Sequence, residues 1–251
     1  MYPILEHDFT TEAKIEPARI IAPGDVPEHC LISFFREVNE KVIDEKQARI
    51  AVPNGWEDGE HPIYEIEHRG RRLAFFHPGV GAPLAAGLLE EAIAFGCRKF
   101  IVCGGCGVLE KELTVGRLIL VESAVRDEGV SYHYLQPGRE IKAQPQALAA
   151  LRSTLAAGGI PFVTGKTWTT DAPYRETQAM IDARRAEGCL TVEMEAASLM
   201  AVARFRNVLL GQILYAGDDL SGDAWDQRSW QSRQEVRASL FWLAADACLA
   251  M

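Results

Sequence analysis

The sequence predicts an α/β fold: a single-domain α/β sandwich with a mixed, mostly parallel central sheet flanked by helices. Three observations carry this prediction. Segments with strand-like and helix-like patterns alternate along the chain, with short connections between them. Residues 208–215 form a continuous apolar run, typical of a central strand that is buried on both faces. The 251 residues are 48% hydrophobic, enough for one large core, so residues 1–251 are expected to form a single domain.

The first half of the chain alternates between short apolar strands and two helical patterns. The stretch 27–44 reads as a helix because its apolar residues, from Leu31 to Val42, recur at helical spacing. A second helix is rich in small residues and covers 82–96. The expected strands are 19–22, which runs into Pro23-Gly24-Asp25, then 47–52, 62–68, 71–77 and 100–103.

The second half continues the same alternation. Residues 192–206 are expected to be helical, with Ala, Leu, Met and Val on one face, and 227–250 form the last amphipathic helix. The remaining expected elements are strands at 117–125, 160–168 and 208–215 and helices at 145–157 and 175–187.

Composition excludes several classes of protein. A net charge of −9 provides no basic stripe to replace phosphate counterions, so no nucleic-acid partner is expected. No apolar run is long enough to cross a bilayer, and acids stand near the N-terminus where a signal peptide has basic residues. We therefore expect a soluble, cytoplasmic protein without a membrane partner. An anionic small substrate remains compatible with this charge, because backbone amides at helix N-termini also bind phosphate.

Six cysteines are present, and their spacing suggests no disulfide framework in a chain of this length. Cys103-Gly104-Gly105-Cys106 has the spacing of a metal-binding pair, but neither a second pair nor a histidine cluster accompanies it. Buried thiols beside a glycine turn are the expected explanation, and no metal site is predicted.

Carboxylates stand at two junctions between elements, where ligands of α/β folds bind. Val192-Glu193-Met194-Glu195 opens a predicted helix, and the strand that follows ends in Gly217-Asp218-Asp219. Cleavage of an N-glycosidic bond needs one carboxylate to hold the ribose as it becomes an oxocarbenium ion and one acid to protonate the departing base. The alternative is a helix with an acidic first turn and a solvated Asp-Asp turn, since acids favour helix N-termini in any case.

Two further junctions are candidates for ligand contact. The strand 100–103 opens into Gly104-Gly105-Cys106-Gly107, where a glycine-rich turn would let the backbone approach a ligand; tight strand–helix packing is the alternative. Trp168 ends another strand, ahead of Thr169-Thr170-Asp171. An aromatic side chain there could stack on a planar base, although a tryptophan of the core is the alternative explanation.

Taken together and in this order, these segments resemble the family of hexameric purine nucleoside phosphorylase, uridine phosphorylase and methylthioadenosine/adenosylhomocysteine nucleosidase. The resemblance covers nearly the whole chain, and its most specific element is Glu193-Met194-Glu195 followed by Asp218 at the next strand end. The turns Pro23-Gly24-Asp25 and Gly79-Val80-Gly81 support it more loosely.

The resemblance implies a role for each matched position. Glu195 would hold the ribose hydroxyls, with Met194 packed on the sugar and Glu193 beside them. His7 would reach across to the ribose of a neighbouring subunit. Asp218 would be the catalytic acid that protonates the base. Trp168, Thr170 and Gly107 would contact the base, and the phosphate side would comprise Gly24, Gly105, Cys106 and Arg126.

The chain also departs from the family pattern. Phosphorolytic members follow the Pro-Gly-Asp turn with a proline and an arginine, where this chain has Val26-Pro27-Glu28-His29. They have another arginine where Val102 stands and a hydroxyl side chain where Gly105 stands. Losing such donors costs about 1.5–3 kcal/mol for each charged hydrogen bond. The glutamine and arginine that usually hold uracil are out of register after Tyr174, which favours a purine.

Three hypotheses follow for function. The resemblance favours a nucleoside phosphorylase that cleaves a ribonucleoside with phosphate to give free base and ribose 1-phosphate. The depleted phosphate site motivates a nucleosidase that uses water instead. The third is a non-catalytic nucleoside-binding protein, disfavoured because Glu195 and Asp218 are both retained. The resemblance implies no metal or organic cofactor, and it implies a homo-oligomer, either a dimer or a trimer of dimers.

Overall fold

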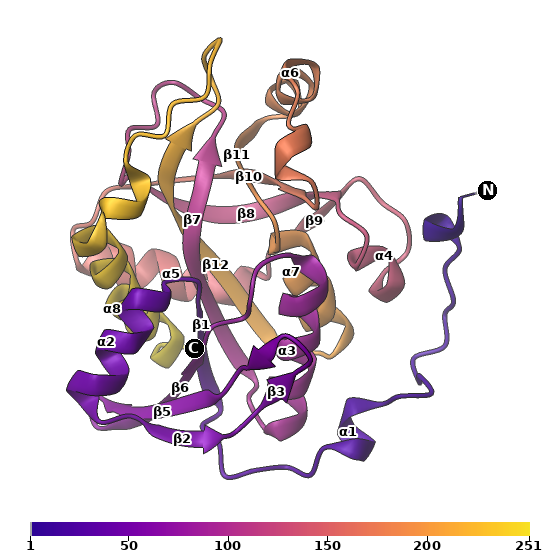
Figure 1. Cartoon of the computed structure of the whole chain (residues 1–251), viewed down its shortest axis with the longest axis vertical. Helices are drawn as coiled ribbons and strands as arrows, with labels where there is room; N and C mark the ends of the chain where they lie inside the picture. Colours follow the sequence, from indigo (N-terminus) through magenta and orange to yellow (C-terminus); the bar gives the residue numbers. More distant parts are fainter. Residues whose placement is uncertain (1) are drawn as a thin grey trace.

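A ten-stranded sheet forms the centre of the computed structural model, which describes residues 2–251 (Figure 1). The strand order is β11-β10-β8-β12-β7-β1-β6-β5-β2, with β9 paired to β8. The strands are β1 (His29–Ser33), β2 (Arg49–Val52), β5 (Ile63–His68), β6 (Arg71–Phe76), β7 (Lys99–Val108), β8 (Leu118–Asp127), β9 (Glu140–Lys142), β10 (Phe162–Thr170), β11 (Cys189–Glu193) and β12 (Leu209–Asp219). A separate hairpin joins β3 (Gly55–Trp56) to β4 (Gly59–Glu60).

The sheet closes on itself at one end. β11 pairs with its neighbour β10 and also, in antiparallel orientation, with β7, where Val192 lies opposite Gly107. A Cβ atom at Gly107 would lie 2.5 Å from Leu220 Cδ1 and 3.0 Å from Val192 Cγ1. A side chain at position 107 would therefore push these strands apart, and the glycine permits the closure.

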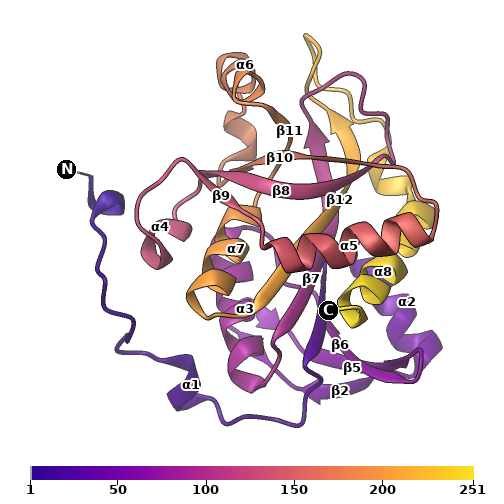
Figure 2. The same cartoon turned by 180° about the vertical axis from the view of Figure 1, so that it is seen from behind.

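Helices cover both faces of the sheet (Figure 2). On one face α3 packs against α7 and α4 against α7; on the other α8 packs against both α2 and α5. The helices are α1 (Pro17–Ile20), α2 (Arg36–Lys46), α3 (Ala82–Phe95), α4 (Ser131–Tyr134), α5 (Pro145–Ala157), α6 (Gln178–Ala186), α7 (Ala196–Phe205) and α8 (Gln234–Leu249), with 3₁₀ turns η1 (Pro3–Leu5), η2 (Pro173–Arg175) and η3 (Trp230–Ser232). Each face of the sheet thereby has its own apolar core.

The predicted α/β fold with a mixed sheet flanked by helices is confirmed. Pairing is parallel along the run β12, β7, β1 and β6 and along the run β8, β10 and β11. β12 meets β8 in antiparallel orientation, and β5 and β2 extend the sheet in antiparallel orientation. The helices expected at 82–96 and 145–157 coincide with α3 and α5, and the apolar run 208–215 is the central strand β12.

Three predicted elements are wrong. Residues 19–22 are not a strand: Pro17 begins the short helix α1, and Ile20 is exposed instead of paired. The helix expected over 27–44 is a strand followed by a helix, because all five residues of β1 are buried between β6 and β7. The helix expected over 192–206 likewise begins only at Ala196, since 189–193 form β11. A short apolar run cannot reveal by its periodicity whether it is strand or helix.

The turn expected at Gly104-Gly105-Cys106-Gly107 is also wrong, because β7 runs through it to Val108. Its glycines accommodate packed neighbours: a Cβ atom at Gly105 would lie 3.1 Å from Tyr215 Cε1. Among residues 2–251, no helix is both long and apolar enough to span a bilayer.

We predict that Phe241→Ala destabilises the protein by about 3–5 kcal/mol, the usual cost of emptying a large aromatic site. Phe241 is fully buried and meets Phe75 and Trp242 edge to face, with ring centroids 5.7 and 5.1 Å away. Urea unfolding gives the measurement. Tyr174→Ala is the control, because Tyr174 is 98% exposed and its loss should change stability by less than about 0.5 kcal/mol. Equal effects of the two substitutions would contradict the assignment of this core.

Candidate functional site

A cleft of about 660 Å³ lies at the carboxyl ends of the central strands. It brings together Glu195 and Asp218, two acids that come from different elements and lie far apart in the sequence. Its walls also include aromatic side chains and the glycines of β7. The lining residues are Phe34, Phe35, Val80, Gly104–Gly107, Pro173, Tyr174, Glu176, Val192–Glu195, Gln212, Leu214, Asp218, Leu220, Trp225, Trp230 and Arg237.

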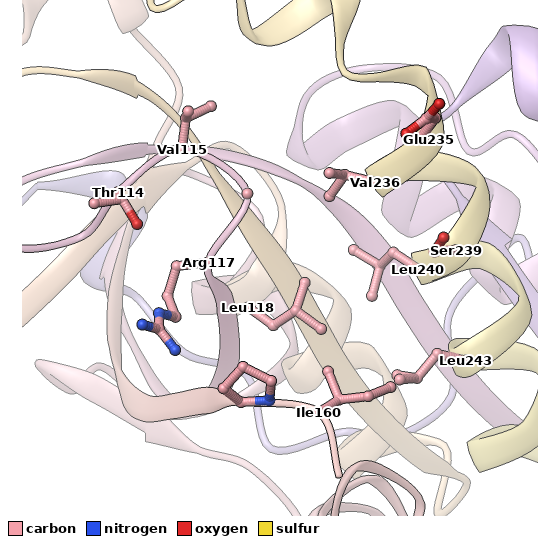
Figure 3. A pocket seen from close by; sticks show the side chains of 12 residues that line it. Thr114, Val115, Arg117, Leu118, Ile160, Glu235, Val236, Ser239, Leu240 and Leu243 are labelled. Carbon is pink, nitrogen blue, oxygen red and sulfur yellow. The ribbon is translucent and has the colours of Figure 1, made fainter. Parts of the chain in front are cut away.

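A second cavity, of about 530 Å³, lies elsewhere in the fold (Figure 3). It is formed by the segment that leads into β8, the start of β10 and the first turns of α8. Its lining is largely apolar, with Arg117 and Glu235 as its charged members, and it contains none of the predicted site residues. The chemistry is therefore to be sought in the larger cleft.

Glu195 stands at the N-terminus of α7, where the backbone N–H of Gly81 donates to Oε1 at 2.5 Å. The residue is 6% exposed, and burial raises the pKa of its carboxyl group to about 8, with the neighbouring charge of Glu193 acting in the same direction. The loop between β6 and α3 thus fixes a carboxyl group whose ionised form is poorly solvated. The ionised form of such a group is stabilised most by a ligand that brings hydroxyl donors or positive charge.

Glu193 has a different part in the site, because its carboxylate caps α7. The backbone N–H groups of Glu195 and Ala196 donate to Oε2 at 2.8 and 2.6 Å, and the Thr169 hydroxyl donates to Oε1 at 2.7 Å. Thr169 also accepts from the N–H of Ala197 at 3.0 Å. Burial raises the pKa of Glu193 to about 7 in spite of these bonds. Since its oxygens are occupied by the protein, Glu193 positions Glu195.

Asp218 lies near the end of β12, and the indole N–H of Trp225 donates to Oδ2 at 2.7 Å. Glu176, from the loop between η2 and α6, lines the same part of the cleft. Burial and the charge of Asp218 raise the pKa of Glu176 to about 7. Two carboxyl groups whose charges repel each other tend to retain a proton between them near neutral pH. This end of the cleft is therefore suited to proton transfer.

Gly105, Cys106 and Gly107 line the cleft as part of β7. The Cys106 thiol points into the structure and donates to the carbonyl oxygen of Tyr215 at 3.3 Å, and burial raises its pKa well above the ordinary value. A thiol in this state is not a nucleophile. The backbone of this segment, and not the sulfur, therefore faces a ligand.

Trp168 and Thr170 lie outside the cleft lining, which corrects their expected place beside a base. Trp168 is fully buried among Leu109, Val125 and other apolar side chains, and its indole N–H donates to Asp127 Oδ2 at 2.9 Å. Thr170 is 4% exposed and accepts from the N–H of Ala172. Both side chains belong to the packing around β10.

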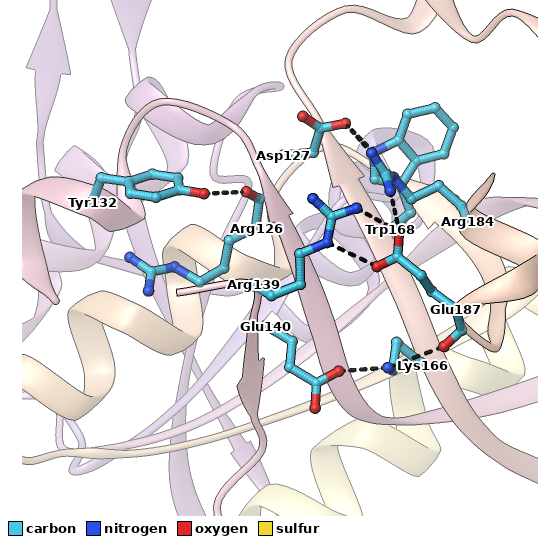
Figure 4. A network of polar contacts seen from close by, with 9 residues as sticks. All are labelled: Arg126, Asp127, Tyr132, Arg139, Glu140, Lys166, Trp168, Arg184 and Glu187. Atoms are coloured by element: carbon cyan, nitrogen blue, oxygen red, sulfur yellow. Dashed lines mark hydrogen bonds and ion pairs between the residues drawn. The ribbon is translucent and has the colours of Figure 1, made fainter. Parts of the chain in front are cut away.

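Arg126 also lies outside the cleft lining, so its predicted place on the phosphate side is corrected. Figure 4 shows it beside Tyr132, whose hydroxyl donates to the Arg126 carbonyl oxygen at 2.8 Å. Its Nε donates to Ser131 Oγ at 2.9 Å, and its two Nη atoms donate to the carbonyl oxygens of Gln136 and Leu135. The guanidinium group lies 4.5 Å from the ring centre of Tyr132. With its donors used, Arg126 holds the loop after β8 in place.

Gly24 does not reach the cleft either, because it precedes β1 and lies at the amino ends of the strands, where its N–H donates to the carbonyl of Phe95. The loop that reaches the cleft follows β1 and contains Phe34 and Phe35. His7 lies on the N-terminal segment outside the cleft of its own chain. Its contact with a neighbouring subunit stays a prediction.

Among the lining residues that the sequence did not predict are Glu176, Trp225 and Arg237. Glu176 lies just after Tyr174, where the family has its uracil-binding residues, and Trp225 follows the Asp-Asp pair by only a few residues. Their closeness to these motifs in the sequence could have indicated that they line the site. Arg237 belongs to α8, and no local pattern distinguishes it from a surface arginine. Within residues 2–251, no group of three or more His, Cys, Asp or Glu could hold a metal ion.

Comparisons with known proteins agree with this architecture. The family model described as the phosphorylase superfamily matches residues 30–246. A guanosine phosphorylase of Halorubrum lacusprofundi is 26% identical over 231 residues, which is 90% of this chain and 95% of that protein. A uridine phosphorylase of Thermococcus kodakarensis is 26% identical over 75% of this chain and 72% of that protein.

Solved structures share the fold. An AMP nucleosidase from Bacteroides thetaiotaomicron matches with a TM-score of 0.73 and 22% identity, covering 89% of this chain and 87% of that one. A uridine phosphorylase from Vibrio fischeri matches with a TM-score of 0.76 and 20% identity, covering 90% of this chain and 91% of that one. At these identities the likeness concerns the fold.

The raised pKa of Glu195 predicts a pH-dependent effect of Glu195→Gln. In the unfolded chain this carboxyl group ionises with its ordinary pKa of 4.5, whereas in the folded protein its pKa is about 8. The folded state therefore binds the proton more tightly, and this contribution to folding stability is fully present below about pH 4.5 and is lost as the pH rises towards about 8. Glutamine removes that loss. The variant should therefore gain stability relative to wild type between pH 5 and pH 8, as measured by denaturant unfolding. Glu57→Gln, at an exposed position, should follow the wild-type curve; a Glu195→Gln curve parallel to wild type would refute the assignment.

Proposed function

Because the chain belongs to the phosphorylase superfamily, we propose that it cleaves the N-glycosidic bond of a ribonucleoside with phosphate, giving free base and ribose 1-phosphate. One observation carries this proposal: Glu195 and Asp218 line a single cleft whose size suits a small ligand. A sugar held at one acid and a base held at the other would place the bond to be broken between them.

On the sugar side, Glu195 would accept hydrogen bonds from the ribose hydroxyls. Gly81 holds one of its oxygens, and Glu193 fixes the backbone from which the side chain projects. As the bond to the base lengthens, positive charge develops on the ribose ring, and a carboxylate in a poorly solvated site stabilises that charge strongly. Met194 lines the same wall and would pack against the sugar.

On the base side, Asp218 would protonate the leaving group. When the bond between C1′ and the base nitrogen breaks, its electron pair goes to the base, and the proton of Asp218 moves to a ring nitrogen of the base. Glu176 supports this role, because burial and the charge of Asp218 raise the pKa of Glu176 to about 7, so that it can hold a proton beside Asp218 near neutral pH. A purine suits this arrangement, since its N7 can accept the proton.

Phosphate would attack C1′ from the side of Gly104–Gly107, where the backbone of β7 lines the cleft. The names of the Halorubrum and Thermococcus relatives support phosphate as the co-substrate. Phosphate oxygen forms the new bond to C1′ as the base departs, so ribose 1-phosphate and the protonated base are the products.

A nucleosidase that uses water is the second candidate, and one observation favours it. Within the described chain, Arg237 is the one cationic side chain that lines the cleft, and its Nη2 already donates to Glu37 Oε2 at 2.8 Å. The lining also contains four carboxyl groups, those of Glu176, Glu193, Glu195 and Asp218. Such a cleft attracts phosphate weakly.

We further propose that residues 1–251 act as one domain within a homo-oligomer. The family match spans 30–246, and one continuous sheet supports the first point. The N-terminal segment supports the second, because Tyr2, Phe9 and Ile15 are each at least 73% exposed and would gain from burial against another subunit. In that assembly His7 could reach a neighbouring cleft.

The nucleophile is tested by incubating the protein with guanosine, inosine, adenosine and uridine, with and without phosphate, and measuring free base and ribose 1-phosphate. Phosphorolysis requires that base release stop when phosphate is omitted. Base release that continues with free ribose as the other product would establish the nucleosidase. No release from any nucleoside, together with thermal stabilisation by them, would leave a binding protein.

Asp218→Asn should lower kcat for purine nucleosides by about 10²–10⁴-fold, the usual contribution of a general acid, with KM nearly unchanged. Asp223→Asn is the matched control, because Asp223 is exposed in the loop after β12 and does not line the cleft. Equal turnover in Asp218→Asn and wild type would remove Asp218 from the mechanism.

A further inference from the structure

We propose that Trp225 is a positioning residue that holds the Asp218 carboxyl group with Oδ1 directed towards the ligand. This inference rests on the proposed function. Trp225 is unusual in its surroundings: it is 61% exposed, yet its indole N–H donates to Asp218 Oδ2 at 2.7 Å. Within residues 2–251 it is the one hydrogen-bond donor to that carboxyl group.

The chemistry of the indole group determines which oxygen of Asp218 is free. An indole N–H is a donor only, so the oxygen that it contacts must act as an acceptor. While this bond is intact, Oδ2 is occupied, and Oδ1 is the oxygen left free to pass a proton to a base.

The geometry places Oδ1 over the floor of the cleft. A Cβ atom at Gly107 would lie 3.7 Å from Oδ1, and Gly107 itself lines the cleft. Oδ1 is therefore the oxygen close to a bound base, while Oδ2 is directed towards Trp225. The oxygen that the indole leaves free is thus the one from which a proton can reach the base.

The loop that carries Trp225 is fixed at its base in spite of its exposure. Asp219 and Asp226 exchange backbone hydrogen bonds of 2.8 and 3.0 Å. The Arg228 guanidinium pairs with the Asp219 carboxylate and donates to the carbonyl of Leu113 at 2.7 Å. The indole is thus presented by an anchored loop, and its bond to Asp218 does not depend on burial of its ring.

The two adjacent acids therefore have separate tasks. Successive side chains of a strand point to opposite sides, so Asp218 faces the cleft while Asp219 faces Arg228 and the loop. Asp219 anchors the loop, the loop supplies Trp225, and Trp225 orients Asp218. No other described residue connects the loop to the catalytic acid.

The test compares Trp225→Phe with wild type on guanosine and on 7-methylguanosine. Phenylalanine keeps an aromatic ring but removes the donor. Guanosine needs a proton on its leaving base, whereas the base of 7-methylguanosine is already cationic and departs without one. We expect kcat for guanosine to fall about 10- to 100-fold with KM within about threefold, as for loss of a hydrogen bond to a charged group, and kcat for 7-methylguanosine to change less than about threefold.

Trp56→Phe is the matched control. Trp56 is 41% exposed, and its indole N–H donates to the Glu91 carboxylate at 2.9 Å, so the same bond is lost at a position that does not line the cleft. This variant should retain wild-type kinetics on both nucleosides. Thermal melts of both variants check that the fold is intact, which the exposure of both side chains favours.

The outcomes are distinguishable. Wild-type kinetics for Trp225→Phe on guanosine, or equal losses on the two nucleosides, would overturn the role of Trp225 and leave the proposed function in place. A wild-type protein that cleaves neither nucleoside would overturn the proposed function, and the role of Trp225 with it. A selective loss on guanosine supports both.

Discussion

The pairing of β11 with β7 is the contact on which the rest of the site depends. It brings the end of β11 against the glycine-rich end of β7, where Gly107 has no side chain to keep the strands apart. Glu193 and Glu195 follow immediately along the chain, and β12 runs beside β7 to deliver Asp218. This pairing therefore brings the segment that carries Glu195 and the strand that carries Asp218 to the same end of β7.

The site binds its acids with neutral donors in place of cations. Backbone N–H groups hold Glu193 and Glu195, and an indole N–H holds Asp218. A lysine or arginine at these positions would lower the pKa of each carboxyl group and compete for the charge that develops on a ligand. Neutral donors fix the geometry while leaving the carboxyl groups able to hold a proton and to respond to a cationic sugar.

The sequence allowed the fold class and the pair of acids to be predicted, because both depend on patterns within short segments. The alternation of elements is local, and Glu195 and Asp218 stand in motifs at predicted junctions. The predictions that failed concern segments whose structure depends on neighbours distant in sequence. β1 resembles a helix until β6 and β7 enclose it, and Trp168 resembles a strand-end aromatic until α6 and β11 cover it. Trp225 lies in a loop whose course is set by Asp219 and Arg228.

The anchoring of that loop through Asp219 has a consequence for how such a site could diversify. The backbone bridge between Asp219 and Asp226 joins the two ends of the segment from Leu220 to Asp226. Residues can therefore be added or exchanged inside this segment while the bridge holds its two ends together. Leu220 and Trp225 of this segment line the cleft together with Tyr174, whose side chain is 98% exposed. Changes of length or sequence between Leu220 and Ala224 would alter which bases enter, while Trp225, if retained, would keep Asp218 in place.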